Sequence, residues 1–193
     1  VPQGSVLGPL LFNLYINDMV TSVDCRLMLY ADDAALVVCD RSLDAVESQL
    51  SSSLNSLQNW LIDNRLSLHL GKTEVLLFAS KKKLKQKPKL NIFCNGTKIS
   101  QVDSAKYLGC LLDSQVSGEI MARKVIDKCI SRLKYLYRQS NFLSRNSRQV
   151  LCNALIMCHM DYASSAWYYG LSQSTKKQLQ ITQNKITRFI MGS

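Results

Sequence analysis

The stretch Leu27–Val38, LMLYADDAALVV, decides the expected fold, because it sets two adjacent carboxylates between two short apolar runs. Both runs, Leu27–Tyr30 and Ala34–Val38, favour strands, so the pattern predicts a β-hairpin with Asp32 and Asp33 at or beside its turn. Adjacent carboxylates repel each other unless a cation is near, and hard divalent cations prefer such oxygen ligands. The pattern therefore suits a metal-dependent phosphoryl-transfer site, although a bare pair of aspartates is more often an exposed acidic turn.

Helical and strand-like patterns continue on both sides of this stretch. Apolar residues at helical spacing predict helices, alternating ones predict strands, and Asn95-Gly96 favours a tight turn with positive φ angles. The expected helices cover residues 10–20, 42–64, 118–140, 145–160 and 174–191. The expected strands cover residues 66–70 and 75–77 around Gly71, a hairpin of 90–94 with 97–100, and residues 106–112. Strands interleave with helices early and helices dominate late, so we expect an α+β fold with an all-helical end.

Charge divides the chain into an acidic and a basic part. The 193 residues carry 24 basic and 14 acidic side chains, for a net charge of +10, and their hydrophobic content of 47% excludes a disordered chain. Residues 1–80 hold four basic and nine acidic side chains, whereas residues 81–193 hold twenty and five. Six lysines fall within residues 81–89. This run suits contact with a nucleic-acid backbone, and a nuclear-targeting patch or a solvated loop are the alternatives.

Seven cysteines, an odd number with no Cys-x-x-Cys pair, indicate reduced thiols rather than a disulfide framework or a zinc site. We therefore expect an intracellular protein of the nucleus or the cytoplasm, with no disulfide-linked partner. No apolar run reaches the length that spans a bilayer, so we expect no membrane partner. The chain begins at Val1 without a basic segment before its first apolar stretch, which argues against a signal peptide and for a piece of a longer protein.

Four sets of short motifs, in this order along the chain, resemble those of reverse transcriptases. They are Pro2-Gln3-Gly4-Ser5 (PQGS), Tyr30-Ala31-Asp32-Asp33 (YADD), Asn64–Leu68 with Lys72-Thr73, and Lys106–Gly109 (KYLG) followed by Leu112-Asp113. Together with the stretch Ala154–Trp167 and the Gln/Lys/Arg-rich segment after it, they are similar to polymerases of non-LTR, LINE-type retrotransposons. A group II intron-type maturase shares the PQGS and YADD signals and is the nearest alternative. The resemblance covers nearly the whole chain.

The resemblance implies a fold, an activity and partners. Residues 1–115 would form part of a polymerase palm, an antiparallel sheet with packed helices, and residues 116–193 would form a helical thumb. The implied activity is RNA-directed DNA polymerisation, the transfer of deoxynucleotides to a primer 3′-hydroxyl with two metal ions. The implied partners are an RNA template, a DNA primer and deoxynucleoside triphosphates. The implied cofactor is Mg²⁺, with Mn²⁺ as the alternative.

The resemblance also implies roles for particular residues. Asp32 and Asp33 would hold the metal as catalytic residues, and Lys72 would act near the leaving pyrophosphate, with a solvated turn lysine as its alternative. The template and the nucleotide would contact Pro2, Gln3, Gly4, Ser5 and Tyr30. The primer end would contact Tyr107, Leu108 and Gly109, and the nucleic-acid backbone would contact Lys81, Lys82, Lys83, Lys85 and Lys87. Trp167, Tyr168 and Tyr169 are expected to be packing residues rather than base-stacking platforms.

In similar polymerases a further metal-binding carboxylate and the fingers precede the PQGS motif. Neither is present here, and Asp18 and Asp24 lie in the wrong place to substitute for the carboxylate. We therefore expect the chain alone to be inactive or very weak. A catalytically inactive nucleic-acid-binding remnant of a retrotransposon polymerase is the alternative function. A basic helical interaction module with no nucleic-acid role is a third.

Overall fold

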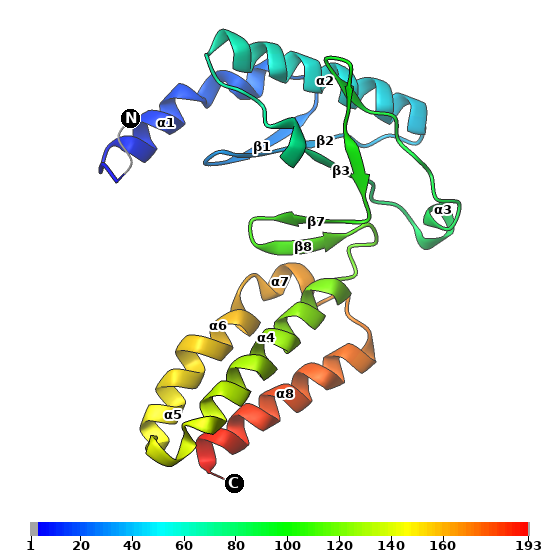
Figure 1. Cartoon of the computed structure of the whole chain (residues 1–193). Coiled ribbons are helices and arrows are strands. Elements are labelled where there is room, and N and C mark those ends of the chain that lie inside the picture. The colour runs from blue at the N-terminus through cyan, green and yellow to red at the C-terminus, as the bar shows by residue number, and fades with distance from the viewer. Residues whose placement is uncertain (1–3, 193) are drawn as a thin grey trace. The chain divides into compact units, whose positions relative to one another are not determined.

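The computed structural model describes residues 4–192, which form two compact units. The first unit contains the residues up to Leu77 together with Lys85–Val102. The second contains Phe78–Leu84 together with the residues from Asp103 onward. Figure 1 draws both units, coloured along the chain. Helices together with small sheets agree with the expected α+β class, whereas the division into a palm over 1–115 and a thumb over 116–193 stays a prediction.

The first unit combines helices with two-stranded sheets. Its helical elements are α1 (Gly8–Tyr15), the 3-10 helix η1 (Asn17–Ser22), α2 (Leu43–Asp63) and the 3-10 helix η2 (Leu70–Lys72). Its strands are β1 (Arg26–Tyr30), β2 (Asp33–Val37), β3 (Glu74–Leu76), β4 (Phe93–Cys94), β5 (Thr97–Lys98) and β6 (Ser100–Val102). β1 pairs antiparallel with β2, β4 pairs antiparallel with β5, and β3 pairs parallel with β6.

The β1–β2 hairpin packs one of its faces onto α2. Leu27 pairs with Leu36 across the hairpin, and both pack in a cluster with Leu57 and Leu61 of α2. Because side chains alternate along a strand, the neighbours of these leucines face away from α2. The expected hairpin and the expected helix over 42–64 are confirmed, and the observed bounds differ from the expected ones by at most one residue at each end.

Two predictions for the first unit are wrong in part. The pattern predicts one helix over residues 10–20, but α1 ends at Tyr15 and η1 follows. This tighter turn brings the buried side chains Ile16 and Met19 into the cluster with α2. Within the described chain, residues 66–69 form no strand, and β3 pairs instead with β6. Leu68 packs against both hydrophobic clusters of the unit. The alternating leucines of this segment can therefore be explained by packing, without a strand partner.

The turn at Asn95-Gly96 is confirmed. These two residues join β4 to β5 with φ angles of 45° and 76°, the positive values that a tight hairpin turn requires. The strands on either side are shorter than expected. Leu90, Ile92 and Cys94 are nevertheless buried in one cluster, as their alternation predicts.

The second unit is a group of helices with a β-hairpin. Its helical elements are α3 (Lys81–Leu84), α4 (Glu119–Arg138), the 3-10 helix η3 (Ser140–Phe142), α5 (Arg145–Cys152), the π-helical segment η4 (Asn153–Met157), α6 (Cys158–Asp161), α7 (Ser164–Trp167) and α8 (Gln173–Met191). Its strands are β7 (Ser104–Tyr107) and β8 (Cys110–Asp113), which pair antiparallel. The expected helices over 118–140 and 174–191 are confirmed, and the one over 145–160 contains a π-helical segment.

One prediction for the second unit is wrong. The apolar run over residues 106–112 predicts a single strand, but the chain reverses inside it to form the β7–β8 hairpin. Leu108 and Gly109 make this turn, with φ angles of 45° and 80°. A glycine accommodates such an angle without strain, whereas Leu108 adopts it against its preference and needs support from its surroundings.

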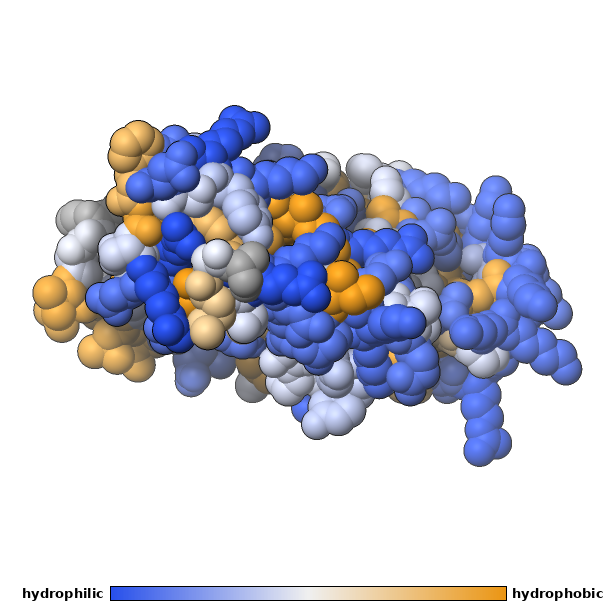
Figure 2. Space-filling model, turned by 90° about the horizontal axis from the view of Figure 1, so that it is seen from below, coloured by the Kyte–Doolittle hydropathy of each residue, from blue (hydrophilic) through white to orange (hydrophobic). Residues whose placement is uncertain are grey.

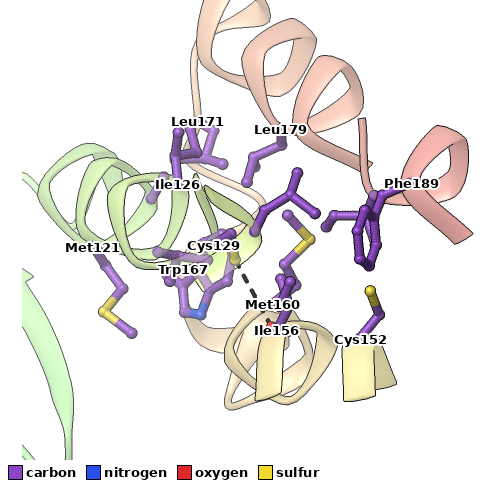
Figure 3. Close-up of a cluster of buried hydrophobic side chains, with 14 of the residues drawn as sticks. Met121, Ile126, Cys129, Cys152, Ile156, Met160, Trp167, Leu171, Leu179 and Phe189 are labelled. Atoms are coloured by element: carbon purple, nitrogen blue, oxygen red, sulfur yellow. Dashed lines mark hydrogen bonds between the residues drawn. The ribbon is translucent and has the colours of Figure 1, made fainter. Parts of the chain in front are cut away.

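The core of the second unit lies between α4, the α5–α6 segment and α8. Figure 3 shows side chains such as Cys129, Ile156 and Phe189 meeting there from different helices. The thiol of Cys129 donates to the carbonyl oxygen of Ile156 at 3.8 Å. Burial raises the pKa of Cys129 to about 11, so this side chain stays a neutral thiol inside the core.

Some hydrophobic side chains remain at the surface. On the face drawn in Figure 2 they form separate patches among mainly hydrophilic residues. α1 is the clearest case, since none of its residues is buried and Leu14 is 67% exposed. All seven cysteines, each of them within the described chain, are free thiols. No helix between residues 4 and 192 combines the length and the hydrophobicity needed to cross a membrane.

Candidate functional site

The tip of the β1–β2 hairpin presents two carboxylates to solvent. Tyr30 pairs with Asp33, so Ala31 and Asp32 form the two-residue turn between them, and Ala31 has a φ angle of 51°. Asp32 and Asp33 are both exposed. Residues that pair across an antiparallel hairpin project from the same face, so Asp33 shares a face with Tyr30. The expectation of two carboxylates at or beside the turn is confirmed.

The face of the hairpin that carries Asp33 is open and largely apolar. It is the face opposite the leucines packed on α2, and it includes the cross-strand pairs Tyr30–Asp33 and Met28–Ala35. Tyr30 is 66% exposed and Met28 is 38% exposed. The open aromatic and apolar surface can accept a flat ring, and the two carboxylates beside it can hold phosphate groups only through a bound cation.

The donor chemistry of this tip fits a divalent cation only in part. Asp32 and Asp33 supply hard oxygen ligands, which Mg²⁺ and Mn²⁺ prefer. Among the described residues, no group of three or more His, Cys, Asp or Glu side chains is placed to hold a metal ion. Further ligands would therefore have to come from phosphate, from water or from residues beyond those described.

Lys72 lies in the same unit but forms no ion pair with the carboxylates in the part of the chain that the structure describes. It ends η2 and is exposed, and its backbone N–H donates to the carbonyl oxygen of His69 at 2.9 Å. Its ammonium group is therefore free to approach an anionic ligand. The role at the leaving pyrophosphate stays a prediction.

Half of the PQGS motif lies outside the described residues, namely Pro2 and Gln3. Gly4 has a φ angle of 86°, and nothing lies within 4 Å of the position of a Cβ atom built on it. The positive φ angle, rather than crowding among the described residues, therefore favours a glycine at this position. The hydroxyl of Ser5 is buried and has no hydrogen-bond partner among the described residues.

The second hairpin, β7–β8, is braced by a residue that the sequence did not single out. The hydroxyl of Tyr162 donates to the carbonyl oxygen of Leu108 at 2.7 Å. A Cβ atom added at Gly109 would lie 3.2 Å from the Tyr162 ring. Tyr162 therefore supports the left-handed Leu108 and packs directly on Gly109, and both belong to the set Tyr107–Gly109 expected at the primer end.

Asp113 anchors the end of the same hairpin to the start of α4. Its carboxylate accepts hydrogen bonds from the backbone N–H groups of Gln115, Ser117 and Gly118 and from the Ser117 hydroxyl, at 3.0 to 3.1 Å. Burial by itself would raise the pKa of Asp113, but these hydrogen bonds outweigh it and hold the pKa below its ordinary value. Asp113, charged at neutral pH, thus fixes the loop that leads into the helices.

The lysines expected to contact nucleic acid are exposed, but they do not belong to one unit. Lys81, Lys82 and Lys83 lie on α3 in the second unit, whereas Lys85 and Lys87 belong to the first. The second unit carries sixteen basic and five acidic side chains, and the first carries eight and nine. The positive charge of the protein is therefore concentrated in the helical unit, which favours polyanions there.

Comparisons with known proteins connect the chain to a polymerase family. A family model described as "Reverse transcriptase (RNA-dependent DNA polymerase)" matches residues 1–112. A relative from Nasonia vitripennis, the "Retrovirus-related Pol polyprotein from type-1 retrotransposable element R1", is 26% identical over 98% of this chain and 58% of its own length. The "RNA-directed DNA polymerase from mobile element jockey" of Drosophila funebris is 26% identical over 100% of this chain and 22% of its own length.

A third relative belongs to another mobile element. The "Probable RNA-directed DNA polymerase from transposon X-element" of Drosophila melanogaster is 28% identical over 100% of this chain and 22% of its own length. The chain thus spans between about a fifth and three fifths of the curated relatives described here. No solved structure matches it significantly.

Proposed function

Because the chain belongs to the reverse transcriptase family, in the form found in non-LTR retrotransposons, we propose that it is the segment of an RNA-directed DNA polymerase that carries the catalytic hairpin. The observation that supports this proposal is the tip of the β1–β2 hairpin, where Asp32 and Asp33 stand exposed beside the open face of Tyr30. The substrates are an RNA template, a DNA primer and deoxynucleoside triphosphates.

In this proposal the reaction forms a bond between the primer 3′-oxygen and the α-phosphorus of the nucleotide, and pyrophosphate leaves. Asp32 and Asp33 would hold divalent cations, with Mg²⁺ the first choice, and the cations would stabilise the attacking oxygen and the leaving group when bound. Lys72 offsets the charge that develops on pyrophosphate or donates a proton to it. The primary task of these side chains is to hold the reacting groups in line.

The remaining predicted residues position the polymers. The turn at Tyr107–Gly109, braced by Tyr162, holds the primer end. Gly4 and Ser5, together with Tyr30, contact the template and the nucleotide. The exposed lysines of residues 81–87 bind the phosphate backbone, and each contact releases counterions, so the affinity falls as the salt concentration rises.

A second candidate function is nucleic-acid binding without catalysis by this segment. One observation favours it. The described residues contain no group of three metal-ligating side chains, and two metal ions need more protein ligands than Asp32 and Asp33 alone provide. The two functions differ in whether Asp32 is needed for nucleotide transfer in a longer polymerase that includes this chain.

Primer extension on an RNA template, with this chain preceded by an upstream polymerase segment, separates the two functions. Asp32→Asn keeps the shape of the side chain and removes its charge. It should lower the rate of primer extension by at least about 100-fold, which corresponds to an increase of about 2.8 kcal/mol in the barrier at about 1.4 kcal/mol per factor of ten. The control, Asp24→Asn, makes the same change at another exposed position and should extend the primer normally. Equal extension by the wild type and Asp32→Asn would remove Asp32 from the mechanism.

A further inference from the structure

The second unit has a pocket of about 410 Å³, and none of the residues that line it belongs to either hairpin. Met160, Trp167 and Leu179, all buried, form its apolar floor and come from α6, α7 and α8. Tyr168 and Tyr169 lie among the exposed residues that line it. This volume is within the range of about 300 to 1,000 Å³ that is typical of sites for small organic groups.

The two tyrosines expose their rings at this pocket. Tyr169 is 82% exposed and Tyr168 is 44% exposed, whereas Trp167 is 5% exposed and donates its indole N–H to the carbonyl oxygen of Tyr162 at 3.1 Å. Trp167 is therefore a packing residue, as expected, whereas Tyr168 and Tyr169 lie at the surface. The ring centroids of the tyrosines are 6.5 Å apart with an interplanar angle of 77°, so their faces are not stacked on each other. Tyr169, the more exposed of the two, can accept a flat partner on its ring, whereas Lys176 lies over the ring of Tyr168.

Polar side chains of the kinds that hydrogen-bond to nucleobases line the pocket beside these rings. The ammonium nitrogen of Lys176 lies 5.2 Å from the centroid of the Tyr168 ring. Gln180 and Gln183, on the same helix as Lys176, supply amides that both donate and accept, and Asp161 supplies a carboxylate that accepts from an amino group. A cation, amides and a carboxylate beside aromatic rings match the edge and the face of a nucleobase.

We propose that this pocket binds an unpaired base of a single-stranded nucleic acid. The ring of Tyr169 stacks on the base, and Tyr168, whose ring plane is 77° from that of Tyr169, contacts the base edge-on. The glutamines and Asp161 bind the edge of the base, and Lys176 faces the adjoining phosphate. The charge of the unit favours a polyanion over a neutral or basic peptide, because it carries sixteen basic and five acidic side chains. This site goes beyond nucleotide transfer, since it uses none of the residues assigned to the catalytic hairpin or to the primer end.

The test measures the affinity of the chain for short fluorescein-labelled oligonucleotides by fluorescence anisotropy. Tyr169→Leu keeps apolar bulk and removes the aromatic face, so it should weaken the binding of single-stranded RNA by about 5- to 100-fold, the range for one lost stacking contact. The slope of affinity against salt concentration should stay unchanged, because no phosphate contact is removed. Single-stranded DNA of the same sequence shows whether the sugar contributes.

The matched control is Phe142→Leu, which removes an aromatic ring that is 85% exposed outside the pocket and should leave the affinity unchanged. Gln183→Leu removes an exposed amide of the pocket and should weaken single strands more than duplexes. If Tyr169→Leu and Gln183→Leu both bind single strands as the wild type does, the proposal is overturned, and a protein partner becomes the better occupant. This result is distinguishable from a failure of the polymerase proposal, which depends on Asp32 and is measured by primer extension.

Discussion

Replacing Asp113 by asparagine tests how the β7–β8 hairpin is held to the start of α4. Asp113 is 8% exposed, and its carboxylate accepts four hydrogen bonds within the loop that ends at Gly118. Asparagine keeps one oxygen but replaces the other by an amide group that cannot accept. The hydrogen bonds of Oδ2, to the Ser117 hydroxyl and to the Gly118 N–H, are therefore lost.

The size of the effect follows from the charge of the acceptor. A hydrogen bond to a charged group contributes about 1.5 to 3 kcal/mol to stability, and the lower end applies to a site that is partly reached by solvent. Losing two such bonds lowers the free energy of unfolding by about 3 kcal/mol. For a protein of this size the midpoint of thermal unfolding should fall by about 6 to 12 °C.

The same carboxylate makes stability depend on pH. The hydrogen bonds hold the pKa of Asp113 in the folded protein below its ordinary value of 3.8. The unfolded chain therefore takes up the proton first as the pH falls, and the stability that the charged Asp113 contributes is complete above pH 3.8. It is lost as the pH falls from there through the folded pKa. The difference between the wild type and Asp113→Asn should shrink over the same interval.

Thermal unfolding followed by circular dichroism gives the global effect, and hydrogen exchange at the Gly118 amide gives the local one. The control is Asp127→Asn, which removes the same charge at an exposed position of α4 and should behave as the wild type. Equal midpoints at neutral pH, with equal protection of the Gly118 amide, would refute the role given to the carboxylate of Asp113.

Two further substitutions test the packing around this loop and the neighbouring turn. Gly118→Ala should destabilise the protein by about 3 kcal/mol or more, as measured by chemical denaturation. The new Cβ atom would lie 2.1 Å from the carbonyl oxygen of Trp167, and the φ angle of 72° at position 118 disfavours a residue with a side chain. A variant as stable as the wild type would contradict this contact. Tyr162→Phe removes only the hydroxyl that bonds to Leu108 and should speed hydrogen exchange in residues 107–110 by about fivefold, the equivalent of one hydrogen bond of about 1 kcal/mol. In primer extension the same variant should raise the KM for the primer and leave kcat nearly unchanged, and unaltered exchange and KM would refute a positioning role.

Local patterns in the sequence were sufficient for the β1–β2 hairpin and for the turn at Asn95-Gly96. Both depend on residues that are adjacent along the chain, on two-residue turns and on the alternation of apolar side chains. The pairing of β3 with β6 was not accessible in this way, because it joins Glu74 to Ser100 and is decided by packing between distant segments. The β7–β8 turn was missed for another reason, since a continuous apolar run gives no sign of the reversal at Leu108 and Gly109.

The residues proposed here for function divide along the same line. The acidic tip is visible in the sequence because its chemistry is confined to a few neighbouring residues, whereas Tyr162 acts on Leu108, 54 positions away. The run from Trp167 to Tyr169 adds a further difficulty, because three consecutive aromatic residues have the same propensity to pack. Successive residues of a helix point about 100° apart, so once Trp167 turns into the core, Tyr168 next to it is directed toward the rim of the pocket. The neighbouring helices decide which of the three side chains turns inward. Whether the other two can bind a ligand therefore depends on the folded unit and cannot be seen in the run of three aromatic residues.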